Sequence, residues 1–243
     1  MNITLIFEHP DFYVVDKPEG VGFHDEDVAM ANKQGTDGTD IKEKQMGFFN
    51  LCAAHFSETL FPVHRLDKLT SGLLILARNK KAAIWFQQAF ENKQIQKYYL
   101  ALSIGKPKKK QGSIIGDMAK ARLSQWKLIK TKENPSITRF FNWGLTSPST
   151  TGLRLFLVKP ETGKTHQIRV ALKSLGSAIL GDKLYGGQDS DRGYLHALML
   201  NFTYGEQEIK LMSFPSSGAL FVDNKNRISE LVQQPELLNW SSK

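Results

Sequence analysis

The stretch VHRLDKLTSGLLILARN, residues 63–79, decides the fold of this 243-residue chain. Its second half, GLLILA, is an uninterrupted apolar run with the length of a strand, and it predicts a strand buried on both faces. Its first half places the cations Arg65 and Lys68 on either side of the carboxylate of Asp67. A charged group beside a buried strand is explained either by a turn that it caps or by chemistry that it performs.

The sequence on both sides of this stretch predicts a mixture of strands and helices. Asn79 is expected to cap the helix after the buried strand, and Thr165 is expected to cap a later helix that Gly176 ends. Because successive strands are separated by short Pro, Ser, Gly and Asn turns, the pattern indicates an α+β fold with antiparallel strands in one continuous domain. Strands are predicted at 3–7, 12–15, 72–77, 98–104, 126–130, 138–145, 152–159, 195–202 and 208–214, and helices at 47–56, 80–92, 167–175 and 227–232.

Two polar segments interrupt this pattern. Residues 25–45 are rich in Asp, Lys, Gly, Thr and Gln, and this composition predicts a flexible loop, which could act as a lid. Residues 106–110 form a basic turn, KPKKK. A solvated surface and a contact with phosphate groups both remain open as explanations of those lysines.

The bulk composition narrows the class of protein. Hydrophobic residues make up 41% of the chain, which is enough for one large core or two small ones. No apolar run approaches the roughly 20 residues that cross a bilayer, and the N-terminus lacks the features of a signal peptide. The single cysteine, Cys52, excludes an internal disulfide and a multi-cysteine zinc site. We therefore expect a cytoplasmic protein without a membrane partner.

The net charge points to a polyanionic partner. Lys and Arg number 32 against 24 Asp and Glu, which gives a formal charge of +8. Such a protein gains affinity for RNA or DNA by releasing condensed counterions. Anionic lipid is less favoured, because we find no basic amphipathic helix with a wide apolar face.

Motifs for metal and nucleotide chemistry are missing. None of the six histidines forms a zinc-type pair, and no phosphate-binding glycine loop or GxSxG sequence is present. Charged segments beside turns remain as candidates, at residues 65–67, 97–99 and 165–169.

Of these, a working Asp67 would need an arginine partner. Burial raises the pKa of a carboxyl group, whereas a neighbouring guanidinium lowers it and orients the carboxylate. Arg65 and Arg169 are both candidates for that partner, and Arg65 could equally reach outward to nucleic acid. Structural roles also remain open: Asp67 as a turn cap, Arg169 on a helix surface and Tyr99 in the core.

Several motifs together resemble the RluA-like family of RNA pseudouridine synthases. The stretch at 63–79 closely matches the family signature, in which HRLD is followed after two residues by TSGLL. Further segments resemble the family in the same order: DKPEGVGFH (16–24), KYYLALSIG (97–105), SIT (136–138), ETGKTHQIRVALKSLGSAILGDKLYGG (161–187) and YLHAL (194–198). The chain departs from the family at Lys164, where the TGR pattern has an arginine, at Ala178, where the proline of the LGxPI pattern is usual, and after Leu198, where His-Pro is often found.

The resemblance implies both an activity and a site. The activity is the conversion of uridine to pseudouridine in an rRNA or tRNA stem-loop, without cofactor or metal. The implied fold is a mixed, mainly antiparallel sheet with flanking helices and loops around a central cleft. It would form a single catalytic domain over 1–243, monomeric and without a separate N-terminal RNA-binding domain. The implied catalytic residues are Asp67, Tyr99 and Arg169, and the implied RNA-binding residues are Arg65, His64, Thr70, Lys164, His166, Gln167 and Leu195.

The resemblance also implies how these residues work. The target uridine must leave its stack, so Tyr99 is expected to stack on the flipped base and Arg65 to fill the gap in the RNA. Asp67 would attack C1′ or promote a glycal-type intermediate, and Tyr99 could also move the C5 proton. Two other functions remain open at this stage: an inactive RNA-binding protein on the same fold, and a base-excising glycosylase or nuclease.

Overall fold

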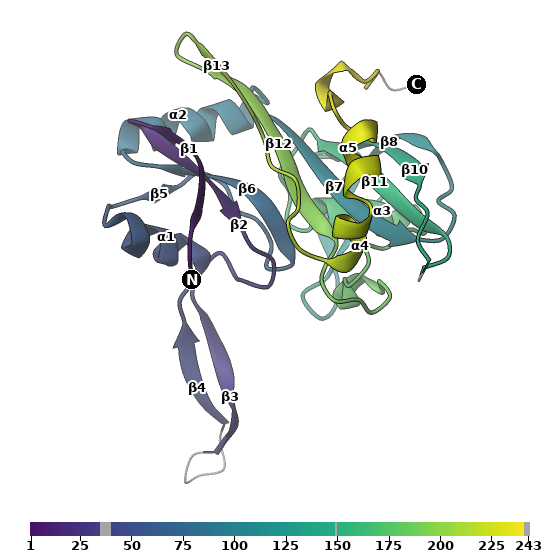
Figure 1. Cartoon of the computed structure of the whole chain (residues 1–243), viewed down its shortest axis with the longest axis horizontal. Coiled ribbons are helices and arrows are strands. Elements are labelled where there is room, and N and C mark those ends of the chain that lie inside the picture. The colour runs from purple at the N-terminus through teal and green to yellow at the C-terminus, as the bar shows by residue number, and fades with distance from the viewer. Residues whose placement is uncertain (35–39, 149, 241–243) are drawn as a thin grey trace.

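One large sheet runs through the body of the protein (Figure 1). The computed structural model describes residues 1–34, 40–148 and 150–240, without the side chains of 28–42. The sheet has eleven strands, with β13 (Gln207–Met212) paired to β12 and β5 (Phe61–Pro62) paired to β6. Its main order is β1 (Thr4–His9), β2 (Phe12–Lys17), β6 (Thr70–Ala77), β12 (Leu195–Tyr204), β7 (Gln96–Ile104), β11 (Leu153–Pro160), β10 (Ser136–Gly144), β8 (Gln111–Lys120) and β9 (Trp126–Ile129).

One pair of neighbouring strands among the described residues is parallel, and it consists of β6 and β12. These strands run parallel over three residue pairs, and all other strand pairs that the structure describes are antiparallel. Gly72 lies in this parallel junction with φ +107°, and a Cβ atom there would sit 2.3 Å from the carbonyl oxygen of Ala197. Only glycine allows the two strands to approach so closely. The predicted α+β class with a mainly antiparallel sheet is confirmed.

Separate cores lie on the two sides of this junction. On one side, Phe86 of α2 (Lys80–Glu91) packs edge to face against Phe12 and Phe202 of the sheet, while α1 (Phe48–Phe56) covers a smaller cluster. As predicted, Asn79 caps α2: its Oδ1 accepts a hydrogen bond from the Ala82 N–H at 2.8 Å. On the other side, β7, β10 and β11 pack against α3 (Gln167–Ser174). The strand β6 is buried along its whole length, as its apolar run predicts.

The third predicted helix forms, but its predicted cap is wrong. The apolar face of Ile168, Ala171 and Leu172 is buried, and the chain turns away at Gly176 with φ +73°. His166, not Thr165, is the N-cap residue, and it has φ +56° and no capping side-chain bond. A threonine cap needs an extended backbone at the cap position, which this left-handed turn does not provide.

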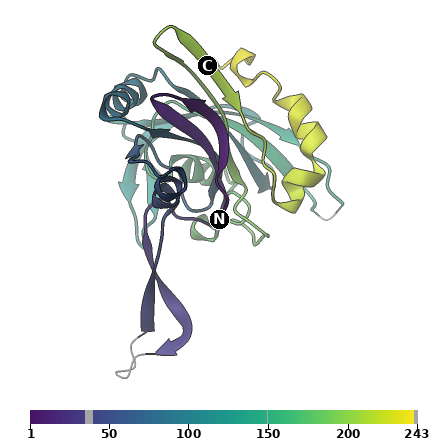
Figure 2. The same cartoon turned by 60° about the vertical axis from the view of Figure 1, so that its left-hand side comes forward.

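The predicted flexible loop at 25–45 is also corrected. Strands β3 (Glu26–Gln34) and β4 (Asp40–Gln45) pair antiparallel and project from the body (Figures 1 and 2). Residues 35–39, within the predicted loop, lie outside the described residues. Asp25 holds the base of this hairpin, because its Oδ1 accepts hydrogen bonds from the Gly47 N–H and the Asn50 amide, both at 2.8 Å. A strand pair away from the core needs no apolar alternation, so composition alone suggested a loop.

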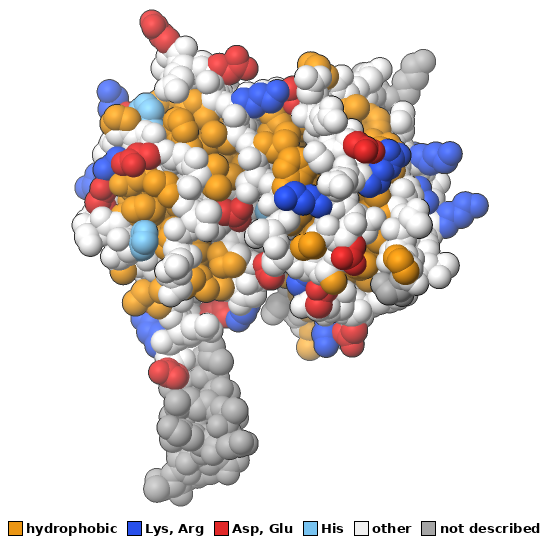
Figure 3. All heavy atoms as spheres, in the orientation of Figure 1, with side chains coloured by type: hydrophobic (Ala, Val, Ile, Leu, Met, Phe, Trp, Pro, Cys, Tyr) orange, Lys and Arg blue, Asp and Glu red, His pale blue; other side chains and the backbone are white. Residues whose placement is uncertain are grey.

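Other short elements complete the molecule. The strand β8 and the helix α4 (Ala219–Asp223) have no counterpart in the sequence-based prediction, while α5 (Lys225–Leu231) does. On the face shown in Figure 3, acidic, basic and apolar side chains are interspersed, so the net positive charge is not concentrated there. Within the described residues, no helix is long and apolar enough to cross a membrane.

Candidate active site

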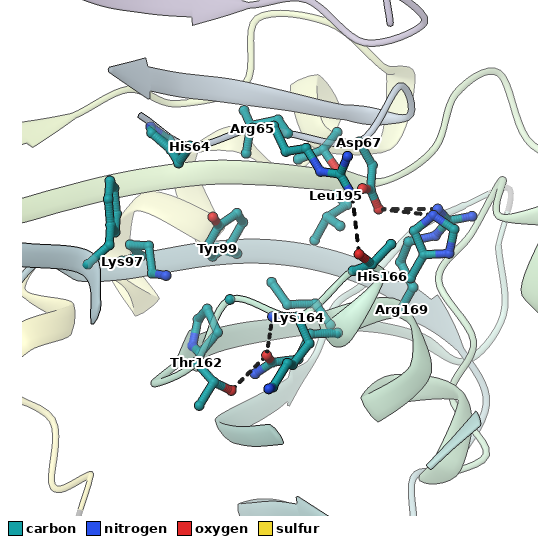
Figure 4. A pocket seen from close by; sticks show the side chains of 18 of the residues that line it. His64, Arg65, Asp67, Lys97, Tyr99, Thr162, Lys164, His166, Arg169 and Leu195 are labelled. Carbon is teal, nitrogen blue, oxygen red and sulfur yellow. Dashed lines mark hydrogen bonds and ion pairs between the residues drawn. The ribbon is translucent and has the colours of Figure 1, made fainter. Parts of the chain in front are cut away.

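A cleft of about 340 Å³ lies beside the β6–β12 junction, between the two cores. Loop residues before β6 form one wall, the start of α3 and the loop before it form the other, and β7 lies at the floor (Figure 4). All the residues implicated by the sequence line this cleft: Asp67, Tyr99, Arg169, Arg65, His64, Thr70, Lys164, His166, Gln167 and Leu195. The chain thus brings together segments that are about 100 residues apart in sequence.

Arg169 is the arginine that contacts Asp67. Its Nη1 donates to Asp67 Oδ2 at 3.2 Å, and the Asp67 side chain remains 23% exposed to the cleft. The Asp67 carbonyl accepts the Thr70 N–H at 2.9 Å, which turns the chain into β6 and aims the carboxylate at the opposite wall. Arg65 is exposed at the rim instead, where its Nη2 donates to Thr165 Oγ1 at 3.1 Å.

A second carboxylate, Asp182, fixes this arginine, although it was not among the site residues predicted from the sequence. Asp182 is buried and accepts two hydrogen bonds from Arg169, from Nε at 2.7 Å and from Nη2 at 2.8 Å. Burial by itself would lower the pKa of Arg169, but the bonds and charge of Asp182, together with Asp67, raise that pKa above its ordinary value. Arg169 therefore stays charged and offers its remaining nitrogen to Asp67.

The two neighbouring tyrosines of β7, Tyr98 and Tyr99, lie in different surroundings, as the resemblance implies. Tyr99 lines the cleft, whereas Tyr98 points into the core and donates its hydroxyl to Gln96 at 2.6 Å. Burial, and then the negative charge of Asp67, raise the pKa of the Tyr99 phenol. Its hydroxyl stays protonated, so this environment favours a stacking surface over a proton acceptor.

His166 lines the cleft near Asp67, and Tyr185 contacts it from behind. The His166 Nε2 atom lies 3.9 Å from Asp67 Oδ2, and its Nδ1 lies 2.9 Å from the Tyr185 hydroxyl. Burial lowers the pKa of His166, although the charge of Asp67 opposes this. The ring is therefore mainly neutral at pH 7.

Gln167 uses its whole amide group within the protein. Its Oε1 accepts from the Thr162 hydroxyl at 2.7 Å and the Lys164 N–H at 3.0 Å, and its Nε2 donates to the Ile137 carbonyl and the Thr138 hydroxyl. These bonds hold the loop before α3, so the geometry gives Gln167 a shaping role in place of a free RNA contact. The prediction of an RNA contact misses this because residue type alone does not reveal which partners an amide already has.

The far end of the cleft holds His64 and Lys97. The Ile75 N–H donates to His64 Nε2 at 2.9 Å, and burial, with the charge of Lys97, lowers the pKa of His64 to about 3. His64 therefore remains neutral and anchors its loop to β6. The Lys97 ammonium lies 5.3 Å from the centre of the Phe90 ring, and burial lowers its pKa to about 8. The segment 97–99 was a candidate from the sequence, but Lys97 itself was not among the predicted site residues.

A buried lysine supports the cleft from behind. Lys17 is fully buried, and its ammonium donates to the carbonyls of Thr70 at 2.9 Å and Pro18 at 2.8 Å. Burial lowers the pKa of Lys17 to about 8, while the nearby charge of Asp67 acts in the opposite direction. Thr70 itself is buried opposite Leu195 in the parallel junction, so both residues belong to the floor of the cleft.

Comparison with known proteins gives one consistent result. Residues 11–174 match the family model described as "RNA pseudouridylate synthase". A Haemophilus influenzae protein named "Uncharacterized RNA pseudouridine synthase" is 46% identical over 235 residues, which is 96% of each chain. A Borreliella burgdorferi protein named "Ribosomal large subunit pseudouridine synthase D" is 30% identical, over 94% of this chain and 70% of its own length. "Ribosomal large subunit pseudouridine synthase C" of Rickettsia bellii is 32% identical, over 79% and 61% respectively.

A solved structure agrees in fold. The chain titled "Human RNA Pseudouridylate Synthase Domain Containing 1" superposes with a TM-score of 0.72 at 23% identity, covering 99% of this chain and 97% of that one. The similarity concerns the fold of the whole chain.

Proposed function

The chain belongs to the RNA pseudouridylate synthase family, and we propose that it converts specific uridines of a structured RNA to pseudouridine in the cleft that holds Asp67, Tyr99 and Arg169. The family and the reaction class predicted from the sequence are confirmed by the family match and the named relatives. The roles of individual residues are our proposal, and they rest on the geometry of the cleft.

The observation that carries the proposal is a carboxylate held by a charged guanidinium in a cleft opposite an aromatic ring. Breaking the N1–C1′ bond of uridine requires access to the sugar, so the nucleotide has to leave its stack. A cleft of about 340 Å³ falls in the range of small-ligand sites and suits one extruded nucleoside. Tyr99 then supplies a face on which the uracil can stack.

Asp67 is the group that acts on the ribose. Arg169 holds one carboxylate oxygen, Oδ2, and the carboxylate can use the other for the reaction. Attack on C1′ gives a covalent ribosyl–aspartate, and removal of a ribose proton gives a glycal. In both routes the uracil leaves through N1, turns, and rejoins C1′ through C5. As that bond forms, the aspartyl ester bond breaks in the first route and the ribose proton returns to its carbon in the second. N1 gains a proton, and the C5 proton is then lost. The raised pKa of Tyr99 favours a group other than this phenol as the acceptor of that proton.

We propose RNA contacts for the cationic side chains that are exposed to solvent at the cleft. Arg65 stands at the rim, where its planar guanidinium can stack in the gap left by the flipped base. Lys164 lies on the opposite wall, and its ammonium donates to Asn134 at 2.8 Å on the surface, where a phosphate can replace that partner. His64, Thr70, Gln167 and Leu195 line the cleft from within and shape it.

Ribosomal RNA is the substrate that we propose, with transfer RNA as the alternative. The support is that two relatives carry the name of ribosomal large subunit synthases. A cytoplasmic location, a monomeric state, the absence of a metal or cofactor, and one catalytic domain over 1–243 remain predictions.

The test is a site-resolved map of pseudouridine in RNA from cells with and without the protein, by carbodiimide labelling. We expect at least one site to depend on the protein and to disappear with Asp67→Asn. RNA bound by the wild type without any new pseudouridine would support an inactive RNA-binding protein. Released uracil or broken strands would support a glycosylase or nuclease.

A further inference from the structure

Tyr185 connects the catalytic cleft to the backbone of β9. It ends a short 3-10 turn, Lys183–Tyr185, that begins directly after Asp182, and its side chain is 2% exposed. Its hydroxyl oxygen lies 3.0 Å from the backbone nitrogen of Trp126 and 2.9 Å from His166 Nδ1. The short segment 182–185 therefore contacts both groups that face Asp67: Arg169 through Asp182, and His166 through Tyr185.

The chemistry of each group determines which atom donates and which accepts in the two hydrogen bonds of the Tyr185 hydroxyl. A backbone N–H can only donate, so the Tyr185 oxygen accepts from Trp126. The single hydroxyl hydrogen of Tyr185 then needs an acceptor, and among the described residues His166 Nδ1 lies within hydrogen-bond distance. A neutral imidazole that accepts at Nδ1 carries its own proton at Nε2. That Nε2–H is the side of the ring that faces Asp67.

From this arrangement we propose that Tyr185 is a positioning residue that fixes His166 in the neutral form protonated at Nε2, so that His166 and Arg169 present two N–H donors to the same oxygen of Asp67. The separation of 3.9 Å between His166 Nε2 and Asp67 Oδ2 exceeds a hydrogen bond, and a small rotation of either side chain closes it. Both donors converge on Oδ2, so the other carboxylate oxygen is the one left for the ribose. That last step rests on the proposed role of Asp67.

A merely structural role for Tyr185 is the competing explanation. The tyrosine ring does pack, since the Arg169 guanidinium lies 4.9 Å from its centre and the His166 ring meets it edge to face at 5.6 Å. Tyr185→Phe keeps this ring and removes only the hydroxyl, so it separates the two roles. The charged groups that act on His166 are Asp67, Arg169, Asp182 and Arg65, and this substitution leaves all of them in place.

The chain provides a matched control in Tyr194. That residue is also buried, accepts a backbone N–H, from Leu220 at 3.0 Å, and donates to a side chain, Asp191, at 2.6 Å. Its ring also faces a guanidinium, that of Arg192 at 5.9 Å. Tyr194→Phe therefore removes an equivalent hydroxyl away from Asp67.

The experiment measures the histidine ring directly. Nitrogen-15 NMR of the histidine-labelled full chain reports which ring nitrogen carries the proton, and the His166 signals are assigned by their loss in His166→Gln. We expect the wild type to show His166 protonated at Nε2, and Tyr185→Phe to lose this preference and to become charged at a higher pH. Tyr194→Phe should leave the His166 signals unchanged.

Turnover gives a second readout. We expect Tyr185→Phe to lower kcat by roughly tenfold to a hundredfold, as loss of a group that orients a reacting residue does, with KM for RNA little changed. Because Gln can also donate an N–H towards Asp67 and does not titrate, Tyr185→Phe should cost much less when combined with His166→Gln.

Two NMR results would contradict the proposed role of Tyr185. A wild-type His166 protonated at Nδ1, or unaltered His166 signals in Tyr185→Phe, overturns the proposal. The NMR result does not depend on turnover, so a chain without pseudouridine synthase activity would refute the proposed function and still leave the tautomer decided.

Discussion

Two carboxylates share the guanidinium of Arg169, and the structure predicts opposite consequences for their replacement. Asp182 is buried and makes two of the bonds, whereas Asp67 is partly exposed and makes one at 3.2 Å. Removing one partner of a buried pair leaves an uncompensated charge and costs about 3–5 kcal/mol. A partly exposed pair contributes no more than about 1 kcal/mol.

Asp182→Asn should therefore destabilise the protein by about 3 kcal/mol, because asparagine keeps one acceptor oxygen but loses the charge and one bond. For a chain of this size that corresponds to a fall in Tm of roughly 6–12 °C. Asp67→Asn should change Tm by about 4 °C at most and yet abolish pseudouridine formation.

Differential scanning calorimetry and single-turnover assays on RNA measure both effects. Asp189→Asn is the control, because its ion pair with Lys183 is exposed on both sides, at 79% and 77%, and should leave Tm and turnover unchanged. An Asp182→Asn variant as stable as the wild type, or an Asp67→Asn variant that loses several kcal/mol, would refute the division of roles between the two carboxylates.

Three further predictions follow from the site and the junction. Tyr99→Phe should retain RNA binding, whereas Tyr99→Ala should weaken it by about 1–3 kcal/mol through loss of base stacking, which a filter-binding titration measures. Gly72→Ala should destabilise the protein by about 3 kcal/mol in chemical denaturation, because the new Cβ atom would meet the Ala197 backbone. Gly205→Ala is the control: Gly205 has φ +61° but open space around it, so this substitution should cost only about 1–2 kcal/mol. The pKa of Lys97 is lowered from 10.5 to about 8 in the folded protein, so the unfolded chain binds the ammonium proton more tightly. The free energy of unfolding should therefore rise with pH between about 8 and 10.5 as far as this lysine contributes to it. Lys97→Met should therefore raise Tm at pH 7, with the gain disappearing towards pH 10.5; a gain that does not vary with pH would contradict this cause.

Local sequence signals predicted the fold most successfully where a single stretch contained the whole signal. The apolar run of β6 and the Asn79-capped helix α2 are such cases, since length, spacing and cap lie within a few consecutive residues. The β3–β4 hairpin was missed because the polar composition of residues 25–45 is typical of a loop, and β8 because glycine and polar residues interrupt its sequence.

The site residues and the need for an arginine beside Asp67 were predicted from the sequence, whereas the partners of Arg169 and His166 within the protein were not. The resemblance selected Asp67, Tyr99 and Arg169, and the structure places all three in one cleft. Asp182 and Tyr185 could not be singled out, because an aspartate and a tyrosine acquire their roles only when folding brings them against Arg169 and His166. The segment that contains both, GDKLYGG, was part of the resemblance, but it gave no indication of their partners.

Asp67 and Arg169 stand on opposite walls, and this has a consequence for sequence changes far from the cleft. Leu66 packs in the core on one side of the junction and Ile168 in the core on the other, so the two cores set the separation of the reacting pair. Misplacement of reacting groups by about 1 Å can cost roughly a hundredfold in rate. Substitutions that change the angle between the cores are therefore expected to give proteins that fold normally, bind RNA normally and react slowly.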